Sequence, residues 1–409
     1  MGAYELHQKL RTKAVRLVKK KDYDQAIQTL YQGSISLFDQ AEQGSACDLA
    51  LYMIEVYGIK MQSVESDSRD RVTDILSKAQ PDFWRKKVID AAVKWSVNAT
   101  GSPSGDPLLR LFIAKLLAKE SQYHLSESHF ISACLPSPTT YQLESAPKAF
   151  SQMMLDWLVE HSRAATENEG EHRDSNAIER IEAGRFALRG LMPLLANRAL
   201  SQARSFLVNF IELATARQKS LLLPVQPNPR PYVPPGSPST TAKSTDVLLY
   251  LTGNPDLNFS QMALALVTEA VQIKSQNDSP RKVAPDWLRN AWMALVRQYE
   301  REAAALQQEE GVREVIPHLS QIYFDIQPPR QQGNMLSDMM ASLFGGSASP
   351  AANHVQAPIA IKQAPPLRPS SKEPSSASGA SLPPAQNTGM AQSGAKDAVA
   401  DDLVDEEMD

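Results

Sequence analysis

Apolar residues recur with the spacing of an α-helix through almost all of residues 1–330, and no other feature limits the fold as strongly. The first of these apolar stripes consists of Leu6, Leu10, Ala14, Leu17 and Val18. Strand-like patterns are confined to 220–234 and 276–284, where proline and polar residues predict a small hairpin or an extended loop. The sequence therefore predicts an all-α fold that can carry a small hairpin insertion.

The helical pattern resumes after a break at Lys21 and Asp22, with a second helix from Ala26 to Phe38. Further breaks divide the rest of the chain into twelve more predicted helices, over residues 46–60, 68–78, 84–97, 107–120, 124–134, 146–162, 175–192, 196–215, 246–251, 258–274, 285–306 and 311–325. Seven of the 28 prolines lie from Pro224 to Pro238, so residues 224–243 are interpreted as a proline-rich insertion.

The breaks between helices repeat a local pattern. In 20–26 an aromatic residue, Tyr23, precedes a small residue, Ala26, by three positions. Residues 120–126 repeat this arrangement, and 197–203 do so with leucine in the aromatic's place. A small residue here lets two helices of a hairpin approach closely, which is typical of tetratricopeptide-like arrays. The pattern predicts an α-solenoid of helical hairpins, and an irregular all-α bundle is the alternative.

The end of the chain has a different composition. Residues 346–409 are rich in alanine, serine, proline and glycine, contain few aromatics and end in an acidic tip at 401–409. Such a segment cannot bury enough apolar surface to offset the entropy of ordering, so it is predicted to be a disordered tail. Residues 331–345 before it predict a short, methionine-rich amphipathic helix. This helix either binds apolar partners or caps the last apolar face of the solenoid.

Charge and cysteine content exclude several classes of protein. The 42 basic and 46 acidic residues leave a net charge of −4, which does not favour nucleic acid or a membrane surface as the partner. Two cysteines are too few for a disulfide framework, which fits a reducing compartment. No signal peptide is evident in residues 1–10, and no apolar run is long enough for a membrane helix. We therefore expect a soluble, cytosolic protein.

A search for catalytic or metal-binding motifs finds none. The phosphate-binding loop, C-x-x-C, H-E-x-x-H and G-x-S-x-G patterns are all absent from the sequence. His124, His129 and Cys134 fall at i, i+5 and i+10, so on a helix they cannot converge on one metal ion. The sequence therefore indicates a protein that is not an enzyme and needs no cofactor.

Two groups of charged residues are candidate docking surfaces or, alternatively, solvated helix faces. Residues 9–21 hold seven basic side chains, which could face an acidic partner. Asp48 and Glu55 are seven positions apart and so share one face of the predicted helix over 46–60. Neither group is diagnostic by itself.

Segments in order through 1–345 together resemble one family, the α-solenoid subunit of the guided-entry pathway for tail-anchored membrane proteins, known as the fourth Golgi-to-ER traffic protein. In animals this subunit is part of the transmembrane-domain recognition complex. The matching segments are AYELHQKLRT at 3–12, QGSISLF at 32–38, QGSACDL at 43–49, EVY at 55–57, VKWS at 93–96, GDPL at 105–108, YHLSESHF at 123–130, residues 186–203, and MLSDMMASLF at 335–344.

The resemblance implies a right-handed superhelix of helical hairpins without catalytic activity. It implies a tight complex with a ubiquitin-like-domain protein and docking of a homodimeric targeting ATPase, which brings the ATPase to the co-chaperone carrying tail-anchored clients. The N-terminal half, 1–130, is expected to contact the ATPase. The C-terminal half, 131–330, is expected to hold the ubiquitin-like partner.

The resemblance also assigns roles to single residues. Asp48 and Glu55 resemble acidic positions that touch the ATPase and restrain its hydrolysis, and Arg11 and Arg16 resemble basic positions of the same N-terminal face. For the ubiquitin-like partner we expect an apolar cleft in about 196–325. Its candidate lining residues, each of which core packing could equally bury, are Leu207, Phe210, Leu264, Leu266, Leu295 and Ile322.

The start of the chain departs from the family pattern. In the family an additional amphipathic helix precedes the segment that matches 3–12. We therefore expect the apolar stripe through Leu6, Leu10 and Leu17 to be exposed. Either the gene model is short at its start, or this protein has lost part of its ATPase-docking surface. A generic tetratricopeptide-like scaffold subunit of another cytosolic complex is the alternative function.

Overall fold

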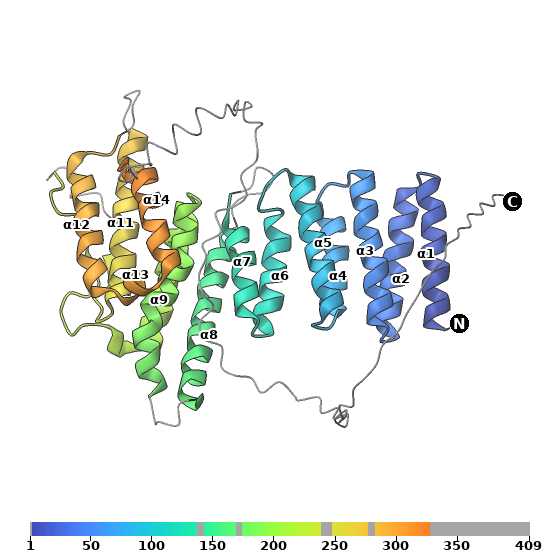
Figure 1. Ribbon diagram of the computed structural model, residues 1–409, viewed down its shortest axis with the longest axis horizontal. Helices are drawn as coiled ribbons and strands as arrows, with labels where there is room; N and C mark the ends of the chain where they lie inside the picture. Colours follow the sequence, from blue (N-terminus) through green and yellow to red (C-terminus); the bar gives the residue numbers. More distant parts are fainter. Residues whose placement is uncertain (1, 137–142, 169–173, 239–247, 277–282, 328–409) are drawn as a thin grey trace, which may run out of the picture. The chain divides into compact units, whose positions relative to one another are not determined.

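The computed structural model describes residues 2–136, 143–168, 174–238, 248–276 and 283–327 (Figure 1). Within these residues the chain forms fourteen α-helices, one 3₁₀-helix and two short strands, so the predicted all-α class is confirmed. The predicted amphipathic helix over 331–345 and the predicted tail over 346–409 lie outside the described residues.

The N-terminal helices are short and similar in length. They are α1 (Ala3–Lys19), α2 (Tyr23–Asp39), α3 (Gln43–Lys60), α4 (Ser66–Lys78), α5 (Phe83–Thr100), α6 (Pro107–Lys119) and α7 (Tyr123–Cys134). Aspartates at N-cap positions begin several of them; the Asp82 and Asp106 carboxylates, for example, accept hydrogen bonds from the amides of Arg85 and Leu109.

The C-terminal elements vary more in length. They are α8 (Ser145–Asn168), α9 (Ser175–Ala196), α10 (Leu200–Arg217), the 3₁₀-helix η1 (Lys219–Leu221), β1 (Arg230–Pro231), β2 (Leu248–Leu249), α11 (Pro255–Gln276), α12 (Asp286–Glu302), α13 (Ala304–Gln308) and α14 (Glu310–Phe324). The two strands pair antiparallel, with Arg230 opposite Leu249.

One type of turn follows five of the described helices. In the first, the Asp22 amide donates to the Leu17 carbonyl at 2.9 Å, and the Lys21 amide donates to the Val18 carbonyl at 2.9 Å. These two bonds define a Schellman turn, which requires a left-handed residue after the helix. The same pair of bonds recurs after α2, α3, α6 and α9, and the left-handed residues of the five turns are Lys21, Ala41, Met61, Ser121 and Arg198.

In four of these turns, all except the one after α3, the residue five positions beyond the left-handed residue is small and completely buried. These four residues are Ala26, Ala46, Ser126 and Ala203. The structure therefore confirms the small positions predicted in 20–26, 120–126 and 197–203, and it adds a fourth after α2. The Ser126 hydroxyl also donates to the Ala114 carbonyl of α6 at 2.7 Å, which is possible only because the two helices lie close together.

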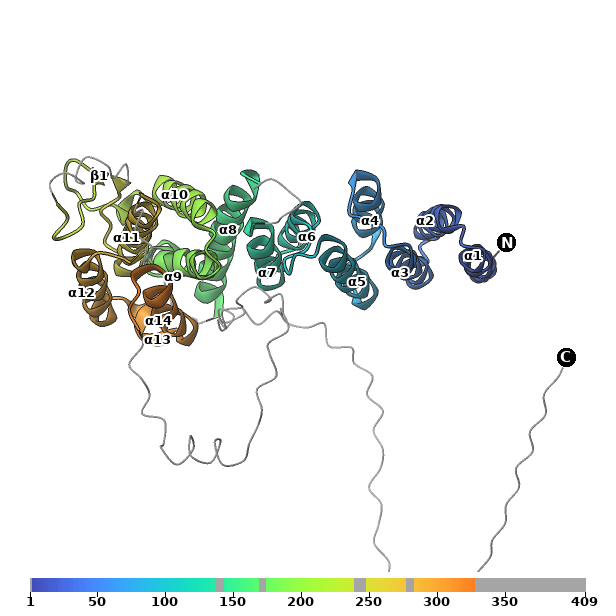
Figure 2. The same cartoon turned by 90° about the horizontal axis from the view of Figure 1, so that it is seen from above.

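Each N-terminal helix packs mainly on the next helix in the chain or on the next but one, as expected for a solenoid of hairpins. Figure 2 shows the helices end-on, with α1, α2 and α3 as consecutive neighbours. Buried apolar residues form two clusters, and α6 contributes to both of them, with Leu109 in one and Leu111 in the other. The core thus divides near α6, and the predicted domain boundary at residue 130 stays a prediction.

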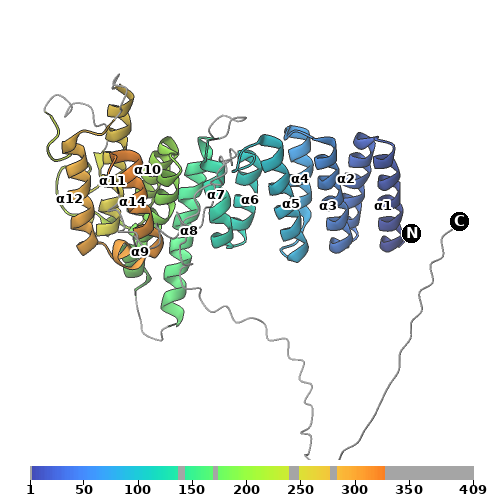
Figure 3. The same cartoon turned by 45° about the horizontal axis from the view of Figure 1, so that its top comes forward.

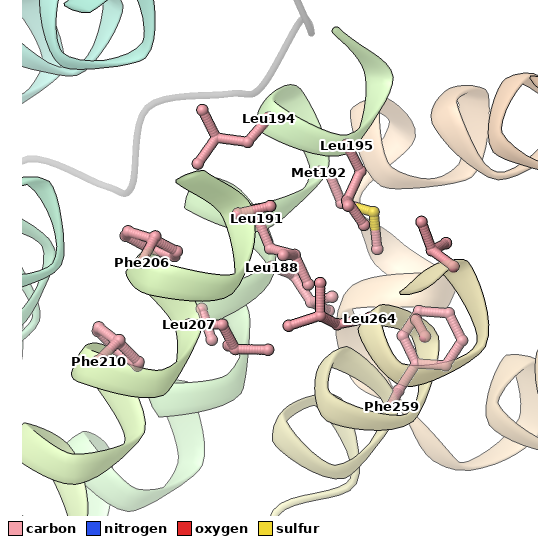
Figure 4. Packing of buried hydrophobic residues seen from close by; sticks show 14 of the residues in the cluster. Leu188, Leu191, Met192, Leu194, Leu195, Phe206, Leu207, Phe210, Phe259 and Leu264 are labelled. Atoms are coloured by element: carbon pink, nitrogen blue, oxygen red, sulfur yellow. The ribbon is translucent and has the colours of Figure 1, made fainter. Parts of the chain in front are cut away.

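Helix α9 is the centre of the C-terminal core. It packs on α8, α10, α11 and α14 (Figure 3). Its side chains interlock with those of α10 and α11, as Figure 4 shows for Leu188, Leu191 and their neighbours. The Tyr323 hydroxyl of α14 donates to the Leu195 carbonyl at 2.7 Å, which satisfies a polar group inside this core.

Three expectations from the sequence are wrong. Of the helix predicted over 246–251, the described residues 248–251 are not helical, since Leu248 and Leu249 form β2 and pair with a strand from the predicted extended segment 220–234. The predicted helix over 285–306 is two helices, because Ala303 has an extended backbone with ψ of 118°. Of the second predicted extended segment, residues 277–282 lie outside the described residues.

The third wrong expectation concerns the apolar stripe of α1. Leu6, Leu10 and Leu17 are not left exposed but are partly buried against the N-terminal core. Leu10 lies directly over Gly33 of α2. The stripe is therefore covered by α2 and α3, and α1 is an integral part of the array.

A substitution at Gly190 of α9 tests how tightly α9 packs against α10. A Cβ atom at this position would overlap the ring of Phe206 on α10. Gly190→Ala should therefore lower the free energy of unfolding by about 1–3 kcal/mol through overpacking. Gly58→Ala is the matched control, because no heavy atom lies within 4 Å of a Cβ there. It should instead raise stability by about 0.5–1 kcal/mol. Urea unfolding measures the change in stability of both variants. An equal change in the two would contradict overpacking at Gly190.

Candidate functional site

The N-terminal candidate surface lies where α1 and α3 come side by side. Arg11 of α1 and Asp48 of α3 form an ion pair, and His7 Nε2 lies 2.8 Å from Asp48 Oδ2. A carboxylate can only accept, so the hydrogen of this second bond lies on Nε2. The Arg11 guanidinium also lies over the ring of Tyr52, 5.6 Å from its centroid. We call this group of His7, Arg11, Asp48 and Tyr52, together with the neighbouring Glu55, the α1–α3 cluster.

The cluster keeps Asp48 ionised. Partial burial raises the pKa of the Asp48 carboxyl, but the hydrogen bonds from His7 and Arg11 outweigh burial and lower that pKa overall. The Arg11 side chain is 45% exposed and that of Asp48 is 35% exposed, so both can reach a partner. An exposed pair of this kind contributes about 0–1 kcal/mol to stability. Its main effect is to hold both charges in place.

Glu55 adds a second negative charge to the same face. It is exposed, and its carboxylate, together with partial burial, raises the pKa of the Tyr52 hydroxyl. Asp48, Tyr52 and Glu55 fall at i, i+4 and i+7 of α3 and so form one row. The structure thus brings together three of the four residues predicted to face the ATPase.

Arg16, the fourth, lies elsewhere on α1. It is five positions from Arg11, which places the two side chains about 140° apart around the helix. Arg16 belongs instead to an outer row of exposed cations at i, i+4, i+7 and i+11, consisting of Lys9, Lys13, Arg16 and Lys20. The sequence argument missed His7 and Tyr52. The only signal for them is their spacing of four residues from Arg11 and Asp48.

Of the six residues predicted to line a C-terminal cleft, five are buried in the core and Ile322 is partly buried against it; the five are Leu207, Phe210, Leu264, Leu266 and Leu295. Leu207 and Leu264 lie between α10 and α11, where Figure 4 shows their side chains directed into the same space. Contact with a partner stays a prediction for all six.

Leu207 and Leu264 form part of an open groove bounded by α10, β2 and α11. The groove has a volume of about 240 Å³ and is lined mainly by apolar side chains. Val208 and Leu248, also in its lining, are 44% and 55% exposed. Exposed apolar side chains gathered in a concave surface are typical of an interaction site. We call it the α10–α11 groove.

His129 does not form a metal site with His124 and Cys134. Within the part of the chain that the structure describes, no three His, Cys, Asp or Glu side chains are grouped so that they could hold a metal ion. The His129 Nδ1 atom accepts a hydrogen bond from the Arg110 guanidinium at 3.1 Å. Burial and the neighbouring Arg110 charge lower the pKa of His129 to about 4. His129 is therefore a neutral, partly buried histidine that helps to join α6 to α7.

This histidine predicts a pH dependence of stability. Unfolded histidine takes up a proton below about pH 6.5, whereas native His129 does so only near pH 4. Stability should therefore fall as the pH drops through this window, by roughly 3 kcal/mol from this residue. Asp256, whose pKa burial raises to about 6, acts in the opposite direction. Between pH 7 and pH 4 the unchanged chain should therefore lose roughly 3 kcal/mol more stability than His129→Asn does, because only the variant lacks the histidine's contribution. Urea unfolding from pH 4 to 7 measures both profiles. Parallel profiles would contradict it.

The helices carry no signature of a membrane span. None of the described helices combines the length and apolar character needed to cross a bilayer.

Comparisons with known proteins agree on one family. A family model described as "Golgi to ER traffic protein 4" matches residues 20–344. Golgi to ER traffic protein 4 of Schizosaccharomyces pombe is 24% identical over 344 residues, which cover 84% of this chain and 91% of that protein. The Xenopus laevis protein "Golgi to ER traffic protein 4 homolog B" is 30% identical over 129 residues, which cover 31% of this chain and 39% of that protein.

A solved structure shares the fold. The crystal structure of C. therm. Get4 has a TM-score of 0.60 and 23% sequence identity, and the match covers 84% of this chain and 90% of that one. The family model spans far more than half of the 409 residues, from the end of α1 to beyond α14. The chain therefore belongs to the Golgi to ER traffic protein 4 family.

Proposed function

We propose that the chain is a cytosolic adaptor in the post-translational targeting and insertion of tail-anchored membrane proteins into the endoplasmic reticulum. It bridges a ubiquitin-like-domain protein, held by its C-terminal half, and a homodimeric targeting ATPase, docked on its N-terminal half. It acts by binding and not by making or breaking bonds. Membership of a family named for Golgi to ER traffic supports this role.

The observation that carries the proposal is the α1–α3 cluster. Arg11 and Asp48 are held in one geometry by His7 and by each other, yet both side chains stay accessible. The pair contributes little to folding, so its arrangement is better explained by a partner than by stability. A surface that presents both signs of charge in fixed positions favours one complementary partner and one orientation.

The outer row of cations on α1 is a second feature that supports the N-terminal half as the docking site for the ATPase. Lys9, Lys13, Arg16 and Lys20 are exposed neighbours on one helix face. Like charges at these spacings destabilise a helix by about 0.2–0.5 kcal/mol per pair. A row of this kind attracts an acidic surface from a distance and raises the rate of association.

Charge reversal of the acidic row tests the proposal. Asp48→Lys combined with Glu55→Lys should weaken binding of the ATP-loaded targeting ATPase by at least about tenfold, because both charges then repel their complement. The variant should also lose its restraint on ATP hydrolysis. Binding is measured by titration calorimetry and hydrolysis by phosphate release.

Glu300→Lys combined with Glu314→Lys is the matched control. These residues are exposed on α12 and α14, outside the α1–α3 cluster, and the double change alters net charge by the same amount. The control should bind the ATPase as the unchanged chain does. If both double variants bind and regulate equally well, the α1–α3 cluster is not the docking site.

A groove in the C-terminal half supports the second proposed contact, which is with the ubiquitin-like-domain protein. The α10–α11 groove exposes Val208 and Leu248 beside the predicted lining residues Leu207 and Leu264. A partner segment with apolar side chains gains about 25 cal/mol for each Å² of apolar surface that it buries there. The groove is therefore the region in which we place the contact with the ubiquitin-like-domain protein.

A further inference from the structure

The α10–α11 groove is ready to receive an apolar segment without rearrangement. The Gln261 side chain of α11 accepts a hydrogen bond from the Tyr250 amide at 2.9 Å and donates one to the Tyr250 carbonyl at 3.0 Å. These two bonds fasten the chain next to β2 against α11, so one wall of the groove is held in place. Leu207 and Leu264 lie between the helices, and Val208 and Leu248 stand open to solvent.

The dimensions of the groove suit one short helix. Two of its charged lining residues, Arg204 and Glu212, are eight positions apart on α10. This separation corresponds to about 12 Å along the helix axis. A ten-residue helix is about 15 Å long. An occupant with one apolar face and one polar face would cover the exposed leucine and valine and leave its polar face in water.

The chain itself contains a segment with this pattern. In residues 335–344 the apolar side chains fall at i, i+1, i+4, i+5, i+8 and i+9, and they are Met335, Leu336, Met339, Met340, Leu343 and Phe344. On a helix these positions form one face, with Asp338 on the other. A helix of this length is not stable alone in water, so it needs a surface to pack against. The family match runs to residue 344 and thus includes the whole segment.

The connection from α14 is long enough to reach the groove. Asp325 lies just after α14, and Lys274, near the end of α11, holds its carboxylate at 2.8 Å. From Lys274 to Leu264 is ten residues along α11, or about 15 Å. The thickness of a helix adds about 10 Å in the transverse direction. Residues 328–334 span up to about 23 Å when extended, which covers the resulting distance of about 18 Å.

We propose that residues 335–344 pack as an amphipathic helix into the α10–α11 groove of the same chain. The methionines adapt to the irregular lining better than branched side chains would. Val208 and Leu248 then become buried, and Asp338 faces solvent. Where the ubiquitin-like partner of the proposed function binds the groove, it displaces this segment; that consequence alone rests on the proposed function.

Cross-linking within the purified full-length chain tests the proposal without any partner. Val208→Cys with Met339→Cys places one thiol in the groove and one on the apolar face of the segment. Met293→Cys with Met339→Cys is the matched control, because Met293 is 42% exposed on α12 and does not line the groove. The native thiols of Cys47 and Cys134 are buried. A short bismaleimide should join the first pair within one chain at least about tenfold faster than the control pair.

A third variant separates docking from simple proximity. Leu343→Asp, added to the Val208 and Met339 pair, puts a charge at the centre of the segment's apolar face and should slow cross-linking to the control rate. Equal rates for the two cysteine pairs, or no effect of Leu343→Asp, would overturn the proposal. Products that join two chains instead of one would assign the segment to a second copy and overturn it as well.

Discussion

The close approach of paired helices at four small buried residues, three of them in the N-terminal half, is the contact on which the helical array depends. Ala26, Ala46, Ser126 and Ala203 each lie just after a Schellman turn, and each is fully buried. The turn reverses the chain within a few residues, and the small side chain lets the second helix lie against the first. Because the turns after α1 and α2 are the same, α3 returns beside α1. Only this return places Asp48 next to Arg11 and His7.

The C-terminal half is packed differently, around one central helix. Its helices gather around α9, so most large apolar side chains there are buried among one another. The β1–β2 pair interrupts this packing, and it leaves the α10–α11 groove between two helices and a strand. The two halves thus present surfaces of opposite chemistry: fixed charges on α1 and α3, and an apolar groove beside α10. That division suits a protein that holds two unlike partners.

The helices could be predicted from sequence because their apolar spacing is a local pattern. The small residues after the turns could be predicted because they too follow a local pattern. The helix predicted over 246–251 is wrong for the described residues 248–251, since a short apolar run fits a strand or a helix equally well and the pairing of Leu249 with Arg230 is not visible in local spacing. Asp48 was found by resemblance, but its bond to His7 joins residues 41 positions apart. Likewise, Leu207 and Phe210 look alike in sequence and both are buried in the core, and only the packing of α11 makes Leu207 also line the groove.

The central claim is that one chain holds a ubiquitin-like-domain protein and a targeting ATPase at the same time. Size-exclusion chromatography with light scattering tests it directly, using the full-length chain, the ubiquitin-like-domain protein and the ATPase homodimer trapped with ATP. The account predicts a single peak that contains all three proteins. Elution of the chain without either one of the two proteins in its peak would contradict simultaneous binding.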